Sequence, residues 1–178
     1  MKKKGALLTL HVFREIIDAV ISIRMRCLLY REQGLYKRSV GKMGNIEEAR
    51  MIFSKDLYAT KLSGISIDEI GKDYAKCSMK LTEDHRNAYG GVMGGAIYTL
   101  ADFAFAVASN YEKAQASVSL SSQTSFMSAT KGAILFAEAK LLKDGKRNNF
   151  FEVTVTDDLD QLVAIVHFTG AHVPFNKS

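Results

Sequence analysis

A chain of 178 residues with 47% hydrophobic and 24% charged side chains is long enough for one domain with a substantial core, and short for two. Its formal charge of +5 does not indicate a nucleic-acid-binding domain, because the basic excess is confined to one end. Residues 1–42 hold ten Lys and Arg against three Asp and Glu, whereas residues 43–178 hold 14 against 16. We therefore expect a basic N-terminal extension outside the core, followed by a nearly neutral domain over residues 43–178.

The cysteines and the N-terminus bear on the compartment. Cys27 and Cys77 form no cluster with each other or with histidines, which indicates neither a disulfide framework nor a zinc site and is typical of a reducing cytoplasm. No stretch reaches the roughly 18 apolar residues of a membrane span. The basic start MKKKGALLTLHVF lacks a small-residue cleavage site, so we expect no secretion. The alternative for the extension is an amphipathic helix over residues 6–30 that binds a membrane surface or a partner.

A capped helix and two strands are predicted after residue 42. Asn45 is a typical helix cap, and acidic residues in the first turn favour a helix over NIEEARMIFSKDLYATKL. The apolar stripe of this helix is expected at Ile46, Met51, Ile52 and Leu57. Apolar and polar residues then alternate in LSGISIDEIG and YAKCSMKLTE, which predicts two strands joined by a turn at GKD.

A long apolar helix and four further strands are predicted for the rest of the chain. The helix runs from about Gly94 to Tyr111. The strands are ASVSLSSQTSFMS, AILFAEAKLLK, FFEVTVTD and LVAIVHFTGAHV, with turn-like connectors between them. One helix, two strands, a long helix and four strands in this order indicate an α+β fold, in which a mostly antiparallel sheet carries the long helix on one face.

One acid interrupts the long helix. Nearly every residue between 96 and 109 is apolar, so the helix is expected to be buried on all sides by a curled sheet and by a second subunit. An ionised carboxylate at Asp102 costs several kcal/mol there unless it is paired or solvated by a cleft. Asp102 is therefore either a structural acid, bonded to an interface backbone or a partner lysine, or a catalytic group.

Two glycine pairs, Gly90-Gly91 and Gly94-Gly95, precede or begin this helix. Tight turns and close backbone packing are the commonest reason for such glycines. The functional alternative is that a glycine N–H at the positive end of the helix dipole binds the oxyanion of an attacked carbonyl. An acid and an oxyanion donor together describe hydrolysis of an acyl group.

The segment NAYGGVMGGAIYTLADFAFAVASN, residues 87–110, resembles the hotdog-fold thioesterases of the PaaI type. Their pattern is an Asn, a glycine-containing turn, His-Gly-Gly and a helix with Leu-x-Asp, and Asn87, Gly94-Gly95 and Asp102 stand at matching spacings. The resemblance extends over about residues 45–173. It implies a hotdog fold, a curled antiparallel sheet wrapped around one long buried helix, and hydrolysis of acyl-CoA thioesters, with no metal and with CoA as part of the substrate rather than a cofactor.

The resemblance also implies roles for individual residues. Asp102 corresponds to the nucleophile or general base, and the Gly94 N–H to the oxyanion donor. Asn87 corresponds to a residue that orients the thioester or the water. Ser119 or Ser121, on the strand after the helix, would contact the water or the substrate.

The sequence departs from the family pattern at Met93, which stands where the family has His before Gly-Gly. Because Met cannot donate a hydrogen bond, this departure favours an alternative function, a hotdog protein that binds acyl-CoA or another apolar ligand without turnover. His85 is the nearest substitute in sequence, although a solvated loop histidine is the favoured interpretation.

Further residues are candidates for substrate binding. Phe103 suggests a pocket for an apolar or aromatic acyl group, unless it belongs to the core. Lys146 and Arg147, in the turn LLKDGKRNN, are candidates for the CoA phosphates, although a solvated hairpin tip is an equal alternative. The predicted substrate-binding set is Gly95, Met93, Phe103, Ser119, Ser121, Lys146 and Arg147.

The spacing of the two principal groups predicts a homo-oligomer. Gly94 and Asp102 are eight residues apart, or about 12 Å along a helix that rises about 1.5 Å per residue. A thioester carbonyl needs both groups within about 3.5 Å, which one helix cannot supply. Two antiparallel helices can, so we expect an obligate dimer with composite sites, or a tetramer of such dimers. As a separate expectation, we predict neither a nucleic-acid nor a membrane partner.

Overall fold

The computed structural model describes residues 45–174, and the predicted basic extension over residues 1–42 lies outside them. The helical elements are α3 (Ile46–Phe53), a π-helical turn η1 (Tyr58–Leu62), a short 3-10 helix η2 (Glu83–His85) and α4 (Gly94–Asn110). The strands are β1 (Ile65–Gly71), β2 (Tyr74–Lys80), β3 (Ala116–Phe126), β4 (Ile134–Asp144), β5 (Asn148–Asp157) and β6 (Leu162–Val173).

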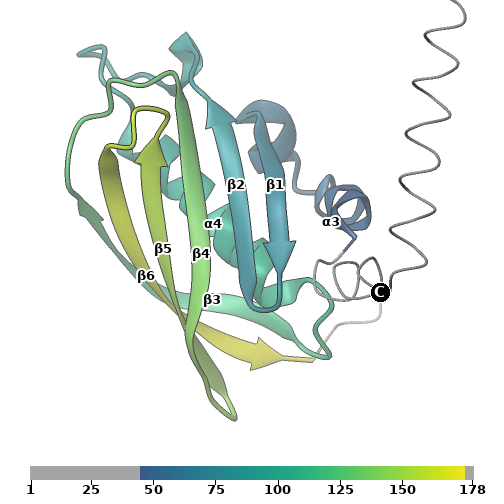
Figure 1. Ribbon diagram of the computed structural model, residues 1–178. Helices are drawn as coiled ribbons and strands as arrows, with labels where there is room; N and C mark the ends of the chain where they lie inside the picture. Colours follow the sequence, from purple (N-terminus) through teal and green to yellow (C-terminus); the bar gives the residue numbers. More distant parts are fainter. Residues whose placement is uncertain (1–44, 175–178) are drawn as a thin grey trace, which may run out of the picture. The chain divides into compact units, whose positions relative to one another are not determined.

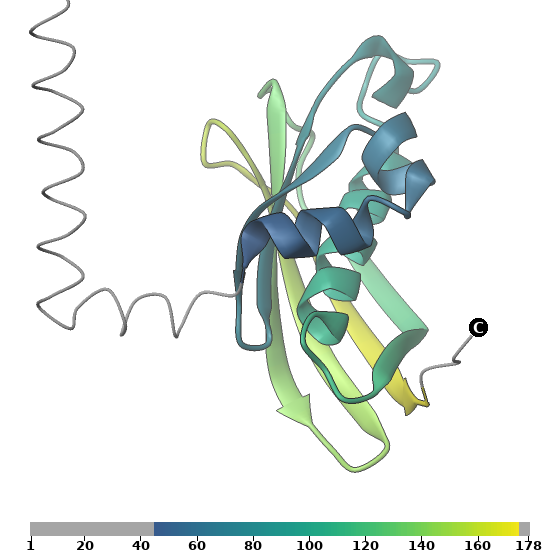
Figure 2. The ribbon, with the colours of Figure 1, turned by 90° about the vertical axis from the view of Figure 1, so that its right-hand side faces the viewer.

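The six strands form one antiparallel sheet in the order β1-β2-β4-β5-β6-β3 (Figure 1). Figure 2 shows the sheet nearly edge-on, with α3 and α4 on the same side of it. The core lies between α4 and the sheet, where Leu100, Ala104 and Val107 of the helix and Val153 and Val166 of the strands are fully buried. The predicted fold, a curled antiparallel sheet around one long helix, is therefore confirmed.

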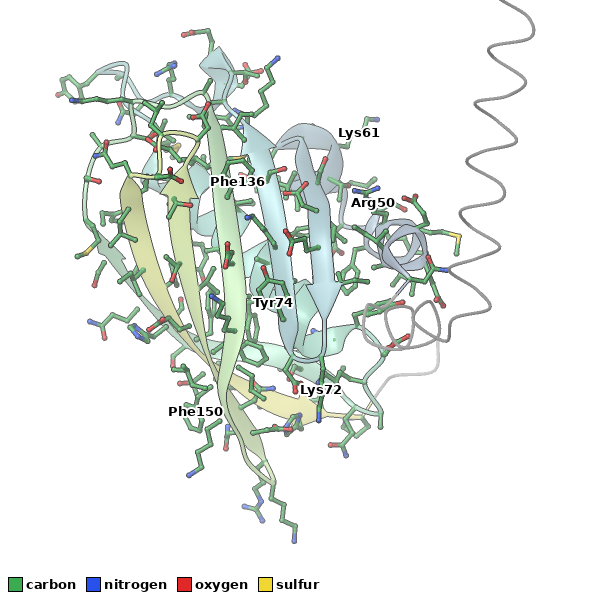
Figure 3. All side chains as sticks on the ribbon, viewed as in Figure 1. Arg50, Lys61, Lys72, Tyr74, Phe136 and Phe150 are labelled. Atoms are coloured by element: carbon green, nitrogen blue, oxygen red, sulfur yellow. The ribbon has the colours of Figure 1, made fainter. Side chains whose placement is uncertain are left out.

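The opposite face of the sheet carries aromatic, polar and charged side chains. Tyr74 and Phe136 lie on this face (Figure 3), and the Lys76 ammonium lies 5.3 Å from the centre of the Phe136 ring. Lys76 also pairs with Glu138 at 3.3 Å. The single apolar face of the sheet is thus the one that packs against α4, as expected for an antiparallel sheet with one solvated side. No helix between residues 45 and 174 has the length and apolar character needed to cross a bilayer.

The helix after Asn45 is capped as predicted, but its apolar stripe is not buried. The Asn45 side-chain oxygen accepts hydrogen bonds from the backbone N–H groups of Glu47 and Glu48 at 3.1 and 3.3 Å. Of the predicted stripe, Ile46 packs partly against the core, whereas Met51, Ile52 and Leu57 are exposed. The face of α3 that meets the core carries Ile46, Ala49 and Phe53, so Met51 and Ile52 point away from it. Leu57 lies beyond the end of α3 at Phe53, whereas the prediction assumed one continuous helix.

Arg50 attaches α3 to the sheet. Its guanidinium donates from Nε and a terminal nitrogen to the backbone oxygen of Ile67 in β1, at 2.9 and 2.7 Å (Figure 3). Ala49 is fully buried beneath the helix, and the Phe53 ring meets the Phe103 ring of α4 edge-on, with centroids 6.1 Å apart. The start of the connection to η1 is therefore held close to the middle of α4.

Helix α4 is not buried on all sides within this chain. Its residues Gly95, Thr99, Asp102 and Ala106 form a stripe that remains at least partly exposed. These positions follow one another by three or four residues and so share one face of the helix. The sheet of the same chain therefore covers only part of the helix, and the expected cover of this face by a second subunit stays a prediction.

Strand β3 is an edge strand that presents exposed apolar side chains. It pairs only with β6, and Val118, Leu120 and Phe126 along it are exposed. A long open edge with apolar side chains is unusual in a monomer, because it offers unpaired backbone groups to other chains. This edge lies beside the open stripe of α4, since the hydroxyl groups of Tyr98 in α4 and Ser122 in β3 are 2.9 Å apart.

The buried carboxylate of Asp157 links the connection between β3 and β4 to the turn between β5 and β6. The side chain of Asp157 is 1% exposed, and both oxygens accept hydrogen bonds. The donors are Thr130 Oγ1 at 2.7 Å and the backbone N–H groups of Lys131, Gly132, Leu159 and Gln161 at 3.0 to 3.2 Å. Burial alone would raise the pKa of Asp157, but these hydrogen bonds to the charged form lower it to about 2. Asp157 therefore fixes the connection before β4 to the turn after β5.

We expect residues 43–178 to suffice for folding and activity. The Asn45 cap and every strand that forms the core lie within this segment. A protein that starts at Met43 should therefore melt within a few degrees of the full chain, as checked by thermal unfolding at equal concentration. An insoluble or strongly destabilised shorter protein would show that residues 1–42 contribute to the core.

Candidate active site

The N-terminus of α4 presents free backbone donors. Met93 occupies the capping position, and its side chain makes no capping hydrogen bond. Within residues 45–174 the N–H groups of Gly94 and Gly95 have no backbone acceptor. They lie at the positive end of a 17-residue helix, where an anion or a developing oxyanion is stabilised. The departure at Met93 thus leaves the donors of the first turn open, while a methionine, 54% exposed, stands beside them.

Gly94 also has a steric requirement. Its φ is not in the left-handed region, unlike that of Gly90 at +80°. A Cβ at Gly94 would instead approach the ring of Phe126 in β3 to 3.0 Å. The glycine therefore allows the end of β3 to pack closely against the start of α4, in addition to any chemical role of its N–H.

Asn87 organises the loop that precedes the helix. Its side-chain oxygen accepts hydrogen bonds from the backbone N–H groups of Tyr89 and Gly91, at 2.9 and 3.2 Å. Its backbone N–H donates to the Gly91 oxygen at 2.8 Å, and Gly90 makes the left-handed turn between them. The side-chain oxygen is thus occupied by the loop, and the side-chain NH2 is the group that remains for a substrate or a water.

His85 is a buried structural residue, so the interpretation as a solvated loop histidine is wrong. It is 7% exposed. Its Nδ1 accepts a hydrogen bond from the Thr82 backbone N–H at 3.0 Å, which places the ring proton on Nε2, 3.1 Å from the Ser63 backbone oxygen. Because both nitrogens are engaged, His85 does not replace the family histidine. The sequence could not reveal this, because Ser63 lies 22 residues away.

Asp102 lies on the open face of α4 and lines a pocket of about 300 Å³. The other wall is formed by Asp56 and Leu57, between α3 and η1, and by Ala59 in η1. Within residues 45–174 its carboxylate has neither a hydrogen-bond donor nor a cation as partner. Burial raises the pKa of Asp102 above its usual value, and the carboxylate of Asp56 raises that pKa further. The described chain thus supplies no structural partner for this acid.

Phe103 belongs both to the core and to the Asp102 pocket. It is 4% exposed, and it packs edge-on against Phe53. It also lines the pocket beside Asp102 and a smaller one under Arg50. The two predicted interpretations of Phe103 are therefore compatible, because a core ring can form the floor of a pocket.

Ser119 and Ser121 lie on opposite faces of β3. The register of β3 on β6 shifts between them, with Ser119 opposite Gly170 and Ser121 opposite Thr169. Ser119 thus shares the face of Ser122, whose hydroxyl contacts Tyr98 of α4, and Ser121 lies on the other face. The sequence did not single out Tyr98 and Ser122 as a pair, because their contact joins residues 24 positions apart.

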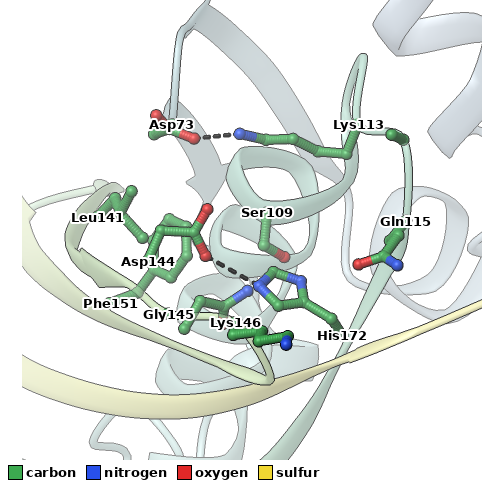
Figure 4. Close-up of a pocket in the computed structure, with 12 residues that line it drawn as sticks. Asp73, Ser109, Lys113, Gln115, Leu141, Asp144, Gly145, Lys146, Phe151 and His172 are labelled. Atoms are coloured by element: carbon green, nitrogen blue, oxygen red, sulfur yellow. Dashed lines mark hydrogen bonds and ion pairs between the residues drawn. The ribbon is translucent and has the colours of Figure 1, made fainter.

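Lys146 and Arg147 are exposed in the turn between β4 and β5. Lys146 lines a second pocket, of about 510 Å³, at the C-terminal end of α4 (Figure 4). There Lys113 is paired with Asp73, and His172 Nε2 lies 2.8 Å from Asp144 Oδ1. This pocket is larger than the Asp102 pocket but contains neither Asp102 nor Gly94. Within one protomer the predicted CoA cations are thus not brought to the predicted catalytic groups.

Gly94 and Asp102 are likewise kept apart within one chain. Both belong to the uninterrupted helix α4, so the rise of about 1.5 Å per residue separates them by about 12 Å. Helix α4 of the described chain therefore presents two separate features: the open N–H groups at its start, and the unpaired Asp102 carboxylate with its pocket near its middle.

Known proteins share this fold and sequence pattern. A family described as a domain of unknown function, DUF4442, matches residues 58–171. A putative esterase of Archaeoglobus fulgidus is 30% identical over 145 residues, which cover 82% of this chain and 92% of that protein. The acyl-coenzyme A thioesterase PaaI of Escherichia coli is 26% identical over 119 residues, which cover 67% of this chain and 84% of PaaI.

Solved structures of other proteins share the fold of this chain. The structure of E. coli PaaI superposes with a TM-score of 0.63 over 72% of this chain and 96% of that chain, at 22% identity. The protein smu.793 of Streptococcus mutans, solved with bound acetyl-CoA, superposes with a TM-score of 0.58 over 62% of this chain and 89% of that chain, at 25% identity. The fold is that of the hotdog proteins. The chain belongs to the DUF4442 family, and it shares the hotdog fold of the thioesterase PaaI.

Proposed function

We propose that this protein hydrolyses acyl-CoA thioesters to a free acid and CoA, with Asp102 as the nucleophile or general base. The observation that carries the proposal is the unpaired, partly buried Asp102 carboxylate in a pocket on the open face of α4. A carboxylate that costs free energy and has no structural partner in the described chain is best explained by chemistry. The relatives support thioester hydrolysis in general, since they include putative esterases and an acyl-CoA thioesterase.

The active site in this proposal is composite. Two protomers associate with their α4 helices antiparallel, so that Gly94 of one faces Asp102 of the other. The Gly94 N–H stabilises the oxyanion that forms when the thioester carbonyl is attacked, and Asp102 activates the water or attacks directly. The partly exposed stripe of α4 and the exposed apolar edge of β3 support this association, because a second subunit would remove both surfaces from water.

Other predicted residues take supporting roles in the proposal. Asn87 orients the thioester or the water through its side-chain NH2, because its oxygen is held by the loop. Ser119 shares the helix side of β3 and is therefore a better candidate for substrate contact than Ser121. Lys146 and Arg147 remain candidates for the CoA phosphates, as contributions from the partner subunit or from a bound CoA that spans both pockets.

Release of free CoA thiol from a panel of acyl-CoAs tests the proposed function. The panel should include short, medium, branched and aromatic acyl groups, with spontaneous hydrolysis subtracted. We expect turnover of at least one class well above background. Binding of acyl-CoA without thiol release would instead establish the alternative, a non-catalytic ligand-binding protein, for which the Met93 departure is the supporting feature.

A further inference from the structure

The Asp102 pocket has a second acid on its opposite wall. Asp56, in the segment between α3 and η1, lines the pocket together with Leu57, Ala59, Phe103 and Ala106. The lining within residues 45–174 contains these two carboxylates and no basic side chain. Sequence analysis gave Asp56 no role, because it is 46 residues from Asp102 and belongs to a connection between helices.

The Asp56 carboxylate makes no structural contact that would explain it. Its backbone oxygen accepts hydrogen bonds from the Thr60 N–H at 2.9 Å and the Thr60 hydroxyl at 3.0 Å, which close the turn that leads into η1. No hydrogen bond or ion pair of its side chain is found within residues 45–174. The turn is therefore held by the backbone, and the charge of Asp56 is free to act on the pocket.

Given the proposed function, the size and lining of the pocket indicate which part of the acyl-CoA binds in it. A volume of about 300 Å³ accommodates an acyl group, but not the nucleotide of CoA. The phosphates of CoA would also be repelled by two carboxylates without a cation between them. The acyl chain is thus the part of the substrate that extends from Asp102 past Leu57 and Phe103 towards Asp56.

We propose that Asp56 is a specificity-determining residue, which excludes acyl groups with a terminal carboxylate and restricts the pocket to uncharged, apolar acyl groups. This inference rests on the proposed function and adds the class of substrate. The physical basis is like-charge repulsion between a terminal carboxylate of the acyl group and the Asp56 carboxylate, which lines the pocket from a solvent-exposed position. Selectivity through an unfavourable contact for the wrong ligand is a general means of discrimination. The charge of Asp56 also reaches Asp102, since it is the second cause that raises the pKa of that acid.

A pair of substrates with chains of equal length gives the test. Butyryl-CoA and succinyl-CoA differ at the end of the acyl chain, where a methyl group is replaced by a carboxylate. We expect the wild-type protein to prefer butyryl-CoA by at least about 10-fold in kcat/KM. Asp56→Asn removes one negative charge at nearly constant shape, so the preference should fall by about fivefold. Asp160→Asn, the same substitution at an exposed site in the turn after β5, should leave the preference unchanged.

The outcomes separate this inference from the proposed function. A preference that Asp56→Asn does not reduce overturns the role of Asp56, whatever the turnover. If the wild-type protein releases no thiol from any acyl-CoA, the proposed function fails. In that case the ratio of the dissociation constants of the two acyl-CoAs, measured by calorimetry, tests the role of Asp56 independently. An equal ratio in the wild type and Asp56→Asn overturns it, as does a failure to bind either ligand.

Discussion

Replacement of Asp102 by Asn is expected to abolish most turnover without loss of the fold. Asn is nearly isosteric with Asp but is a poor base and a poor nucleophile, so kcat should fall by about 100-fold or more. The same change removes a partly buried charge that has no partner in the described chain. The melting temperature of Asp102→Asn should therefore be equal to or higher than that of the wild type, as found where a functional acid costs stability.

The pH dependence of the wild-type protein provides a second measurement on the same group. Asp102 acts in its ionised form, and burial followed by the charge of Asp56 raises its pKa above the ordinary 3.8. The acid limb of kcat/KM should therefore lie at a higher pH than that of an ordinary aspartate, and activity should be lost as the pH falls through it. Near wild-type turnover in a folded Asp102→Asn protein, or a marked drop in its melting temperature, would make the carboxylate structural.

Replacement of Asp157 by Asn is expected to cause a large loss of stability. The five hydrogen bonds to the Asp157 carboxylate come from Thr130 and from backbone groups on both connections. An amide offers one oxygen and turns its NH2 towards donors, so at least two partly buried N–H groups lose their acceptor. At about 1 to 3 kcal/mol for each unsatisfied group, we expect a loss of about 3 kcal/mol in the free energy of unfolding.

The pH dependence of the free energy of unfolding provides a second test of the role of Asp157. The folded pKa of Asp157, about 2, lies below its ordinary value of 3.8, so its contribution is present above about pH 4 and is lost as the pH falls towards 2. Asp157→Asn should lack this part of the acid dependence. Asp160→Asn in the same turn is the control, because Asp160 is exposed and its φ of +59° is one that Asn tolerates. Equal melting temperatures for the two variants, measured at equal concentration, would contradict the role of Asp157.

The sequence predicted those features that depend on local pattern. The Asn45 cap, the helix from Gly94 and all six strands follow from capping chemistry, apolar periodicity and turn residues, which act over a few positions. The acid in the apolar helix was recognisable for the same reason, since one carboxylate in such a run is a local anomaly.

The features that sequence reasoning missed depend on tertiary contacts. The ring of His85 is buried against Ser63, and Asp56 lines the Asp102 pocket although the two acids are 46 residues apart in sequence. Neither contact leaves a periodic signal. The faces of Ser119 and Ser121 were not predicted, because they depend on the register shift at Leu120, which places the two serines on different faces of β3.

Complementation between two inactive variants tests the composite site most directly. One variant is Asp102→Asn, and the other is Gly94→Pro, which removes the proposed oxyanion donor. Gly94 is the first residue of α4, its φ is not positive, and Met93 before it is extended, so the backbone suits proline. Gly94→Ala is the control, because it places a Cβ against Phe126 but keeps the N–H. Greater activity in Gly94→Ala than in Gly94→Pro assigns the loss to the N–H.

The two variants are co-expressed with different tags, and the mixed dimers are purified and assayed for thiol release. In a mixed dimer one composite site carries both defects and the other carries neither. We therefore expect purified mixed dimers to show about half the wild-type activity per dimer, and a random mixture about a quarter. Mixed dimers that form and remain inactive would contradict the pairing of Gly94 and Asp102 from different subunits.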